Sequence, residues 1–239
     1  MKQDNSIIEA FTEMAPDYEE IVDHELRTFW GWSYIGFIKE LLGRVNIQTN
    51  DIILDIATGT GVIPEQISRS TQTKIQIIGL DITHAMINIA KQKADMQTTA
   101  TKPVFTCGDA MKMPFPNACF HKILCGLATH HMNAETLVSE MKRILKPDGV
   151  ITLADVGGAA FWRLPLVREL MKTATFLYFL PKEGWARAQS EADAVINVRT
   201  SEEWSMILKS NGFREVTICK LRSRFFWVPD PIIISATRV

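Results

Sequence analysis

The sequence predicts an α/β fold, a doubly wound and mostly parallel sheet with helices on both of its faces. From residue 51 onward, short apolar runs alternate with segments of helical periodicity, which is typical of parallel α/β sheets. The first of these runs, Ile52–Ile56, is soon followed by the tight turn Gly59-Thr60-Gly61. A buried strand followed by such a turn can deliver a nucleotide-like ligand to the start of a helix. We therefore expect the site at the carboxyl ends of the strands.

The apolar runs of the sequence predict seven strands. The first five alternate with helices, and a short connection containing Pro229 and Pro231 joins the last two. We expect these two strands to pair antiparallel as a C-terminal hairpin. The strands are expected near residues 52–56, 75–80, 103–106, 120–126, 149–155, 215–221 and 231–237.

Helices are predicted where apolar residues recur at helical spacing. Turn and cap residues mark their ends: Lys146-Pro147-Asp148-Gly149 is expected to form a turn before the fifth strand, and Ser201 is a candidate cap for the last helix. The expected helices cover residues 6–24, 26–45, 61–70, 84–96 and 134–146, with further helical stretches at 166–180 and after 201.

A single domain over residues 1–239 is predicted, since 239 residues with 46% hydrophobic content can bury one large core. We divide it into an N-terminal helical lid (1–48), a ligand-binding core (49–156), an inserted helical cover (157–200), and a C-terminal helix and hairpin (201–239).

Composition and charge argue against several functional classes. A formal net charge of -1 offers no broad basic surface, which disfavours nucleic acid as a partner. The longest apolar stretch, residues 176–180, is closed by Pro181 and is far shorter than the ~20 residues of a membrane span. No transmembrane segment and a cytoplasmic location are therefore expected. The four cysteines form no C-x-x-C pair, and His130 and His131 are adjacent, so no metal site is expected.

Three predicted strands end in an aspartate, and this series narrows the ligand. Asp55 precedes Gly59 by four residues, where a carboxylate suits an ammonium group through a charge-assisted hydrogen bond. Asp81 can take both hydroxyls of a ribose, and Asp109 can reach an adenine amine. One such aspartate alone is more often a helix cap, but three on one sheet edge favour a binding site. Pro64, at the position of the third glycine of a dinucleotide motif, disfavours a dinucleotide.

Four stretches carry a resemblance to a known family. They are Leu54 to Gly61, Gly79 to Met86, Gly108 to Phe120 with its Met-Pro-Phe-Pro-Asn run, and Arg143 to Leu153 with its Leu-Lys-Pro-Asp-Gly run. In them the chain resembles the class I S-adenosylmethionine-dependent methyltransferases, and within these the ubiquinone and menaquinone biosynthesis methyltransferases. The resemblance covers about residues 11 to 156. It implies a seven-stranded, Rossmann-like methyltransferase fold, with S-adenosyl-L-methionine as cofactor and S-adenosyl-L-homocysteine as product.

The resemblance also implies roles for the strand-end residues. The turn after the first strand would hold the methionine part of the cofactor, Asp81 the ribose, and Asp109 with Ala110 the adenine. Ile82 and Met86 would sandwich the base, and an N-terminal motif of Phe11, Ala15 and Tyr18 would close over the cofactor through the tyrosine. The full set of predicted cofactor-binding residues is Tyr18, Asp55, Ala57, Gly59, Thr60, Gly61, Asp81, Ile82, Met86, Gly108, Asp109, Ala110 and Gly126.

The two histidines are the catalytic candidates. Methyl transfer from a sulfonium depends mainly on positioning and on excluding water, and a base is needed only if the acceptor must lose a proton. His130 and His131 follow the fourth strand, where the family's acceptor meets the methyl group, and one neutral imidazole is suitably basic near pH 7. His131 is slightly favoured. The alternative is that one histidine only hydrogen-bonds the backbone.

Aromatic residues predict the acceptor side. Phe29, Trp32, Trp162 and Tyr178 are the expected contacts of a bulky hydrophobic acceptor, such as an aromatic or prenylated metabolite. Ordinary core packing accounts for the aromatic N-terminal cluster equally well. Ala128-Thr129 stands where the quinone enzymes typically carry Arg-Asn, so the chain departs from them here. Whether carbon, oxygen or nitrogen is methylated stays open.

Three other functions remain open. The same cofactor site can serve a cyclisation or rearrangement, with the cofactor as a structural cation, because a fold does not fix a function. An NAD-dependent oxidoreductase is a further alternative, against which Pro64 and Asp55 count. The last is a subunit that binds the cofactor without turnover. The expected partner is a hydrophobic small molecule, and a homodimer is an open alternative to a monomer.

Overall fold

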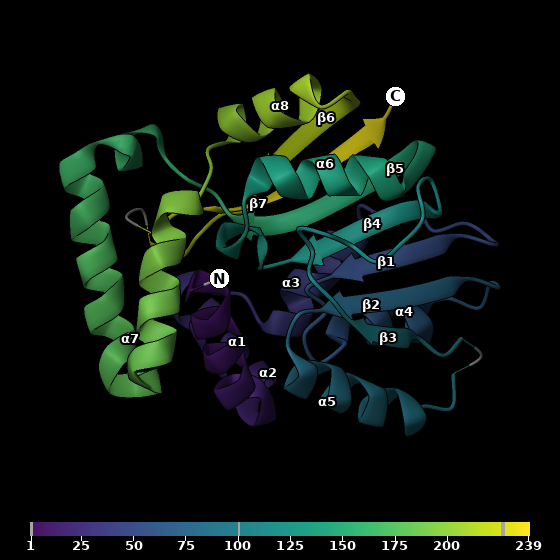
Figure 1. Ribbon diagram of the computed structural model, residues 1–239, viewed down its shortest axis with the longest axis horizontal. Coiled ribbons are helices and arrows are strands. Elements are labelled where there is room, and N and C mark those ends of the chain that lie inside the picture. The colour runs from purple at the N-terminus through teal and green to yellow at the C-terminus, as the bar shows by residue number, and fades with distance from the viewer. Residues whose placement is uncertain (1, 100, 226–227) are drawn as a thin grey trace.

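The centre of the computed structural model, which describes residues 2–99, 101–225 and 228–239, is a seven-stranded sheet (Figure 1). The strand order is β3-β2-β1-β4-β5-β7-β6, with parallel pairing from β3 through β5 and antiparallel pairing of β7 with both neighbours. The predicted α/β fold and its antiparallel C-terminal strands are confirmed. The strands are β1 (Ile52–Ile56), β2 (Gln76–Asp81), β3 (Val104–Cys107), β4 (Phe120–Gly126), β5 (Leu145–Val156), β6 (Phe213–Lys220) and β7 (Pro231–Arg238).

Helices cover both faces of the sheet because successive side chains of a strand point to opposite faces. In β1, Ile53 packs in a buried cluster with Phe37 and Ile67, whereas its neighbour Leu54 belongs to a cluster that contains Trp204. The first cluster includes residues of α3 (Tyr34–Leu42) and α4 (Val62–Ser70), together with residues of the N-terminal helices. The second includes residues of α6 (Ala134–Ile144) and α8 (Ser201–Ser210). A smaller cluster joins α5 (His84–Asp95) to Phe105 of β3.

The N-terminal helices are shorter than predicted. A 3₁₀ turn η1 (Ala15–Asp17), containing Pro16, separates α1 (Lys2–Met14) from α2 (Tyr18–Phe29). The single helix expected over residues 26–45 is wrong, because Gly31 has a φ of +75° and ends the helical path after α2. Ser33 then caps α3 by accepting a hydrogen bond from the backbone N–H of Gly36 at 3.0 Å.

Helix α7 (Pro165–Ala194) forms the cover and folds back on itself. Gly184 interrupts it with φ +80° and ψ −177°, a conformation that only glycine adopts readily. Figure 1 shows its two parts side by side next to α1, which α7 contacts. The 3₁₀ turns η3 (Ala160–Arg163) and η4 (Val195–Asn197) flank it. Among the described residues, no helix combines the length and the apolar character needed to cross a membrane.

Two predicted boundaries differ from the structure. Thr200, not Ser201, caps α8, since its hydroxyl accepts from the backbone N–H of Glu203 and the Glu203 carboxylate accepts from the backbone N–H of Thr200. The predicted turn Lys146-Pro147-Asp148-Gly149 lies inside β5, where Asp148 has a φ of +59° and the register of β4 against β5 shifts. The division into lid, core and cover stays a prediction.

Candidate functional site

The end of β1 is a loop of unusual backbone conformation held by Asp81. Ala57 and Gly59 have φ values of +52° and +54°, in the left-handed region. Asp81, at the end of β2, accepts hydrogen bonds from the backbone N–H groups of Gly59 and Thr83, each at 2.8 Å. Burial raises the pKa of Asp81. One carboxylate therefore ties the ends of two strands together.

Asp55 is a buried carboxyl group with one oxygen unpaired. Its Oδ2 accepts a hydrogen bond from the Thr58 hydroxyl at 2.6 Å, while its Oδ1 is buried without a partner. Burial raises the pKa of Asp55 to about 8. A buried unpaired oxygen is costly to the fold, and a donor such as a ligand amine would remove that cost.

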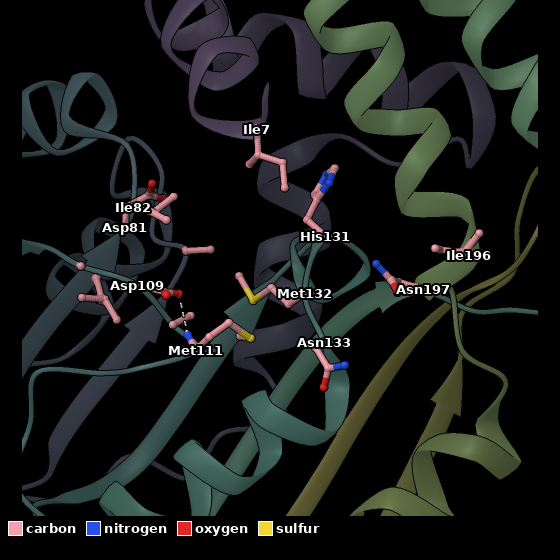
Figure 2. Close-up of a pocket in the computed structure, with 14 residues that line it drawn as sticks. Ile7, Asp81, Ile82, Asp109, Met111, His131, Met132, Asn133, Ile196 and Asn197 are labelled. Carbon is pink, nitrogen blue, oxygen red and sulfur yellow. Dashed lines mark hydrogen bonds between the residues drawn. The ribbon is translucent and has the colours of Figure 1, made fainter. Parts of the chain in front are cut away.

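A cavity of about 310 Å³, here called the sheet-end cavity, lies at the carboxyl ends of β1, β2 and β3. Figure 2 shows Asp81 and Ile82 on one side of it and Ile196 with Asn197 on the other. Six of the predicted cofactor-binding residues line it, namely Ala57, Asp81, Ile82, Gly108, Asp109 and Ala110. The residues predicted to contact ribose and adenine are thus brought together.

A second cavity of about 530 Å³, here called the apolar cavity, lies between α2, α7 and the ends of β4 and β5. Most of its wall is apolar or aromatic, including Phe11, Phe29, Trp30 and Phe179. Among the described residues, the titratable side chains that line it are those of Tyr18, Glu25, His130, His131, Arg187 and Glu191.

A small cavity of about 70 Å³, here called the bridging cavity, shares lining residues with both of these spaces. Phe11, Tyr18 and His131 line both it and the apolar cavity, and Asp81 and Ile82 line both it and the sheet-end cavity. The Tyr18 ring lies against the glycine turn, 3.4 Å from the position that a Cβ atom at Gly59 would take. Tyr18 therefore lies over the turn at the boundary between the two larger cavities.

His130 is held by a buried carboxylate. Its Nδ1 lies 2.6 Å from Oδ1 of Asp155, and its backbone N–H donates to Oδ2 at 2.9 Å. Thr129 and Val156 also donate to Asp155. Burial acts to lower the pKa of His130, but the charge and hydrogen bond of Asp155 outweigh it, so the pKa is raised. Asp155 therefore fixes the ring of His130 through Nδ1.

His131 has different partners and the opposite shift. Its Nε2 lies 3.3 Å from Oε1 of Glu191 in α7, and its Nδ1 is buried without a hydrogen bond. Burial and the charge of His130 lower the pKa of His131. At neutral pH, His131 is therefore the more readily neutral of the two imidazoles.

Arg187 is the centre of a buried ionic cluster beside His131. Its guanidinium lies 2.9 Å from Glu191, 3.3 Å from Glu183 and 3.6 Å from Glu25. It also lies over the Phe11 ring at 5.0 Å. Three carboxyl groups around one guanidinium leave a formal excess of negative charge.

Sequence reasoning missed Asp155 and this cluster. Asp155 ends the fifth strand just as Asp55 and Asp81 end the first two, so its position was a usable signal. Glu25, Arg187 and Glu191 carried no such signal, because they meet only through the fold-back of α7 at Gly184.

The remaining predicted residues lie in several places. Gly59 and Met86 line the bridging cavity, and the Thr60 hydroxyl donates to Glu19 at 2.6 Å. Gly61 packs under Phe105, and Gly126 packs against Ile63. Asp55, Thr60, Gly61 and Gly126 are not among the residues that line the three cavities. Their predicted roles stay predictions.

Of the four predicted acceptor contacts, one lies in the apolar cavity. Phe29 lines it, and Tyr178 packs against the Phe29 ring with centroids 5.3 Å apart. Trp32 instead donates to the carbonyl of Arg222 at 3.4 Å, and Trp162 lines a separate hollow. Trp32, Trp162 and Tyr178 are not among the residues that line this cavity. Trp32 follows the break between α2 and α3, whereas Tyr178 lies behind the cavity-lining ring of Phe29.

One group among the described side chains has the composition of a metal site. His130, His131 and Glu191 offer ligand atoms within 4.8 Å of one another. Arg187 already supplies a positive charge 2.9 Å from Glu191, and Asp155 occupies Nδ1 of His130. The expectation of no metal site stays a prediction.

Part of the chain is similar to known proteins. Residues 53–149 match the family described as a methyltransferase domain. The demethylmenaquinone methyltransferase of Lactobacillus johnsonii is 25% identical over 64% of this chain and 61% of its own length, so the chain spans about three fifths of that relative. A ubiquinone/menaquinone biosynthesis C-methyltransferase of Geotalea uraniireducens is 29% identical over 69% of this chain and 71% of its own length.

Solved structures share the fold at low sequence identity. A SAM-dependent methyltransferase from Aquifex aeolicus aligns with a TM-score of 0.62 and 16% identity, covering 94% of this chain and 98% of its own. The [4+2]-cyclase SpnF aligns with a TM-score of 0.67 and 17% identity, covering 86% of this chain and 82% of its own.

Proposed function

We propose that this chain, which carries a class I S-adenosylmethionine-dependent methyltransferase domain resembling those of the quinone biosynthesis enzymes, methylates a hydrophobic small molecule. The observation that supports this most directly is the bridging cavity. It joins a space lined by strand-end carboxylates to a space lined mainly by apolar side chains. A donor in the first space and an acceptor in the second would meet beside Tyr18 and His131.

The residues present fit the proposed cofactor. The unpaired buried oxygen of Asp55 would suit a ligand ammonium, and Gly59 of the neighbouring turn lines the bridging cavity. Asp81 and Asp109 lie in the sheet-end cavity, where a ribose and an amine-bearing base would find acceptors. When bound, the cofactor supplies an electrophilic methyl group on a sulfonium.

We assign the proton-accepting role to His130, in place of the slight preference for His131 from the sequence. Asp155 fixes the ring through Nδ1, so Nε2 is the nitrogen that would take a proton from the acceptor. His131 and Phe11 pack edge to face with centroids 5.4 Å apart. Together they narrow the passage and exclude water from the reacting atoms.

The acceptor class follows from the walls of the apolar cavity. About 530 Å³ lined by aromatic and aliphatic side chains suits an aromatic or prenylated compound. The relatives that act in quinone biosynthesis make a quinone-type ring one candidate. Ala128-Thr129, in place of the Arg-Asn pair typical of quinone enzymes, leaves other hydrophobic compounds equally open.

The test is transfer of a labelled methyl group. The purified protein would be incubated with S-adenosylmethionine labelled in the methyl group and a panel of hydrophobic phenols, quinols and amines. We expect label in at least one acceptor and formation of S-adenosylhomocysteine in equal amount. A second candidate, a cyclase, is suggested by the shared fold with SpnF. Conversion of a compound without label transfer would support that function and overturn methyl transfer.

A further inference from the structure

The buried cluster around Arg187 is not needed by the proposed methyl transfer. Arg187 is the only cation among its members, and Glu25, Glu183 and Glu191 surround it at 3.6, 3.3 and 2.9 Å. The Arg187 side chain is 7% exposed, so water screens these charges little. One guanidinium balances one carboxylate, which leaves two carboxyl groups without a permanent counter-charge.

Glu191 is the carboxylate nearest to Arg187, at 2.9 Å, and it also lies close to Nε2 of His131. Although burial opposes it, the charge of Arg187, aided by the contact with His131, drives the pKa of Glu191 well down. Glu191 is therefore the partner of Arg187. The excess negative charge of the cluster therefore lies on Glu25 and Glu183.

Of the two carboxyl groups without a counter-charge, Glu25 is the one that faces the apolar cavity. It lines that space, and its Oε1 is buried without a hydrogen bond. Burial raises the pKa of Glu25 to about 8, with the nearby carboxylates of Glu191 and Glu183 adding to this and Arg187 opposing it. In the empty protein, a proton thus takes the place of a missing cation.

The walls next to Glu25 suit a cation that is carried on an apolar body. Phe29, Trp30 and Phe179 line the same cavity, and aromatic faces attract ammonium groups. An uncharged polar group would leave Glu25 protonated, and an anion would add a negative charge beside the carboxyl groups of the cluster. We propose that the apolar cavity selects an acceptor bearing a basic amine and that Glu25, supported by Glu183, holds its ammonium group; this rests on the proposed function.

Three probes of one shape test the proposal by calorimetry: phenylbutylamine, phenylbutanol and phenylbutanoate. Each would be titrated into the full chain at pH 7, with and without saturating S-adenosylhomocysteine, whose thioether sulfur is uncharged, unlike the sulfonium of the methyl donor. We expect the amine to bind roughly tenfold or more tightly than the alcohol, as for a hydrogen bond to a charged group. Equal or tighter binding of the alcohol or the carboxylate would overturn the proposal.

Matched variants place the effect at Glu25. Glu25→Gln keeps the size of the side chain, and we expect it to remove the preference for the amine while the alcohol binds as before. Glu183→Gln should weaken amine binding in the same direction and keeps the test decisive if Glu25→Gln does not fold. Glu20→Gln, an exposed change on the same helix, is the control. An unchanged preference in both Glu25→Gln and Glu183→Gln would overturn the assignment.

Proton exchange gives a second readout. The charged groups facing Glu25 are Arg187, Glu183 and Glu191, with Tyr18 and the two histidines nearby. Because an ammonium would ionise Glu25, amine binding at pH 7 should release up to one proton, seen as a dependence of the binding heat on buffer. Absence of release would count against the proposal. If the unchanged protein did not bind S-adenosylhomocysteine, the proposed function would be overturned. The ratio of amine to alcohol affinity would still test whether Glu25 holds an ammonium group.

Discussion

At the residue scale, Asp155 controls the protonation of His130. It lies 2.6 Å from Nδ1 and raises the pKa of His130 against the effect of burial. Since the neutral imidazole accepts the proton, kcat/KM should fall as the pH drops through this raised pKa. Asp155→Asn should move that fall to lower pH and reduce kcat roughly 100-fold, because the ring loses its fixed orientation. A pH profile that stays in place would remove His130 and Asp155 from the proton-transfer step.

Asp81 has two roles, and a single substitution removes both of them. It holds the turn through Gly59 and Thr83, and it lines the sheet-end cavity. Asp81→Ala should weaken binding of S-adenosylhomocysteine by roughly 1 to 3 kcal/mol through lost charged hydrogen bonds. Calorimetry measures this, with the exposed Asp95→Ala as a control. Equal affinity for Asp81→Ala and the unchanged protein would show that the ribose assignment is wrong.

At the element scale, two adjacent residues at the start of α8, Thr200 and Ser201, differ in whether they cap the helix. Thr200 and Glu203 form a reciprocal capping box, whereas the hydroxyl of Ser201 is buried without a partner. Thr200→Ala should lower the free energy of unfolding by about 1 kcal/mol. Ser201→Ala should leave it unchanged or slightly higher, because no hydrogen bond is lost. Urea denaturation of the two variants measures both, and equal destabilisation would contradict the assignment of the cap.

The elements also explain which parts of the site were predictable. Asp55, Asp81 and Asp109 follow strands whose apolar runs are visible in the sequence, and parallel strands bring their carboxyl ends to one edge. Trp32 does not line the apolar cavity, and Gly31 ends the helix that periodicity extended through it. Arg187 was missed because its position depends on the fold-back at Gly184, which a pattern of apolar residues does not encode.

At the scale of the whole molecule, the site combines segments that are far apart in the chain. The N-terminal helices supply Phe11 and Tyr18, the sheet supplies Asp81 and the η2 turn (Thr129–His131) supplies His131. Arg187 comes from the cover, about 170 residues after Tyr18. In the proposed function, the regular core would thus build the cofactor side, and the helices around it would build the acceptor side. This division would account for a cofactor site that the sequence predicts and an acceptor that sequence similarity does not identify.

The increase in thermal stability on ligand binding can distinguish S-adenosylmethionine-type cofactors from dinucleotides. A ligand that binds only the folded state at about 100 times its Kd adds about 2.7 kcal/mol to the free energy of unfolding. For a chain of this size, that corresponds to a rise in Tm of roughly 5 to 10 °C. We expect this rise with S-adenosylhomocysteine and none with NADH, because Pro64 stands where a dinucleotide site needs glycine. Thermal unfolding with each ligand at equal concentration measures it. A rise with NADH alone would favour an oxidoreductase over a methyltransferase.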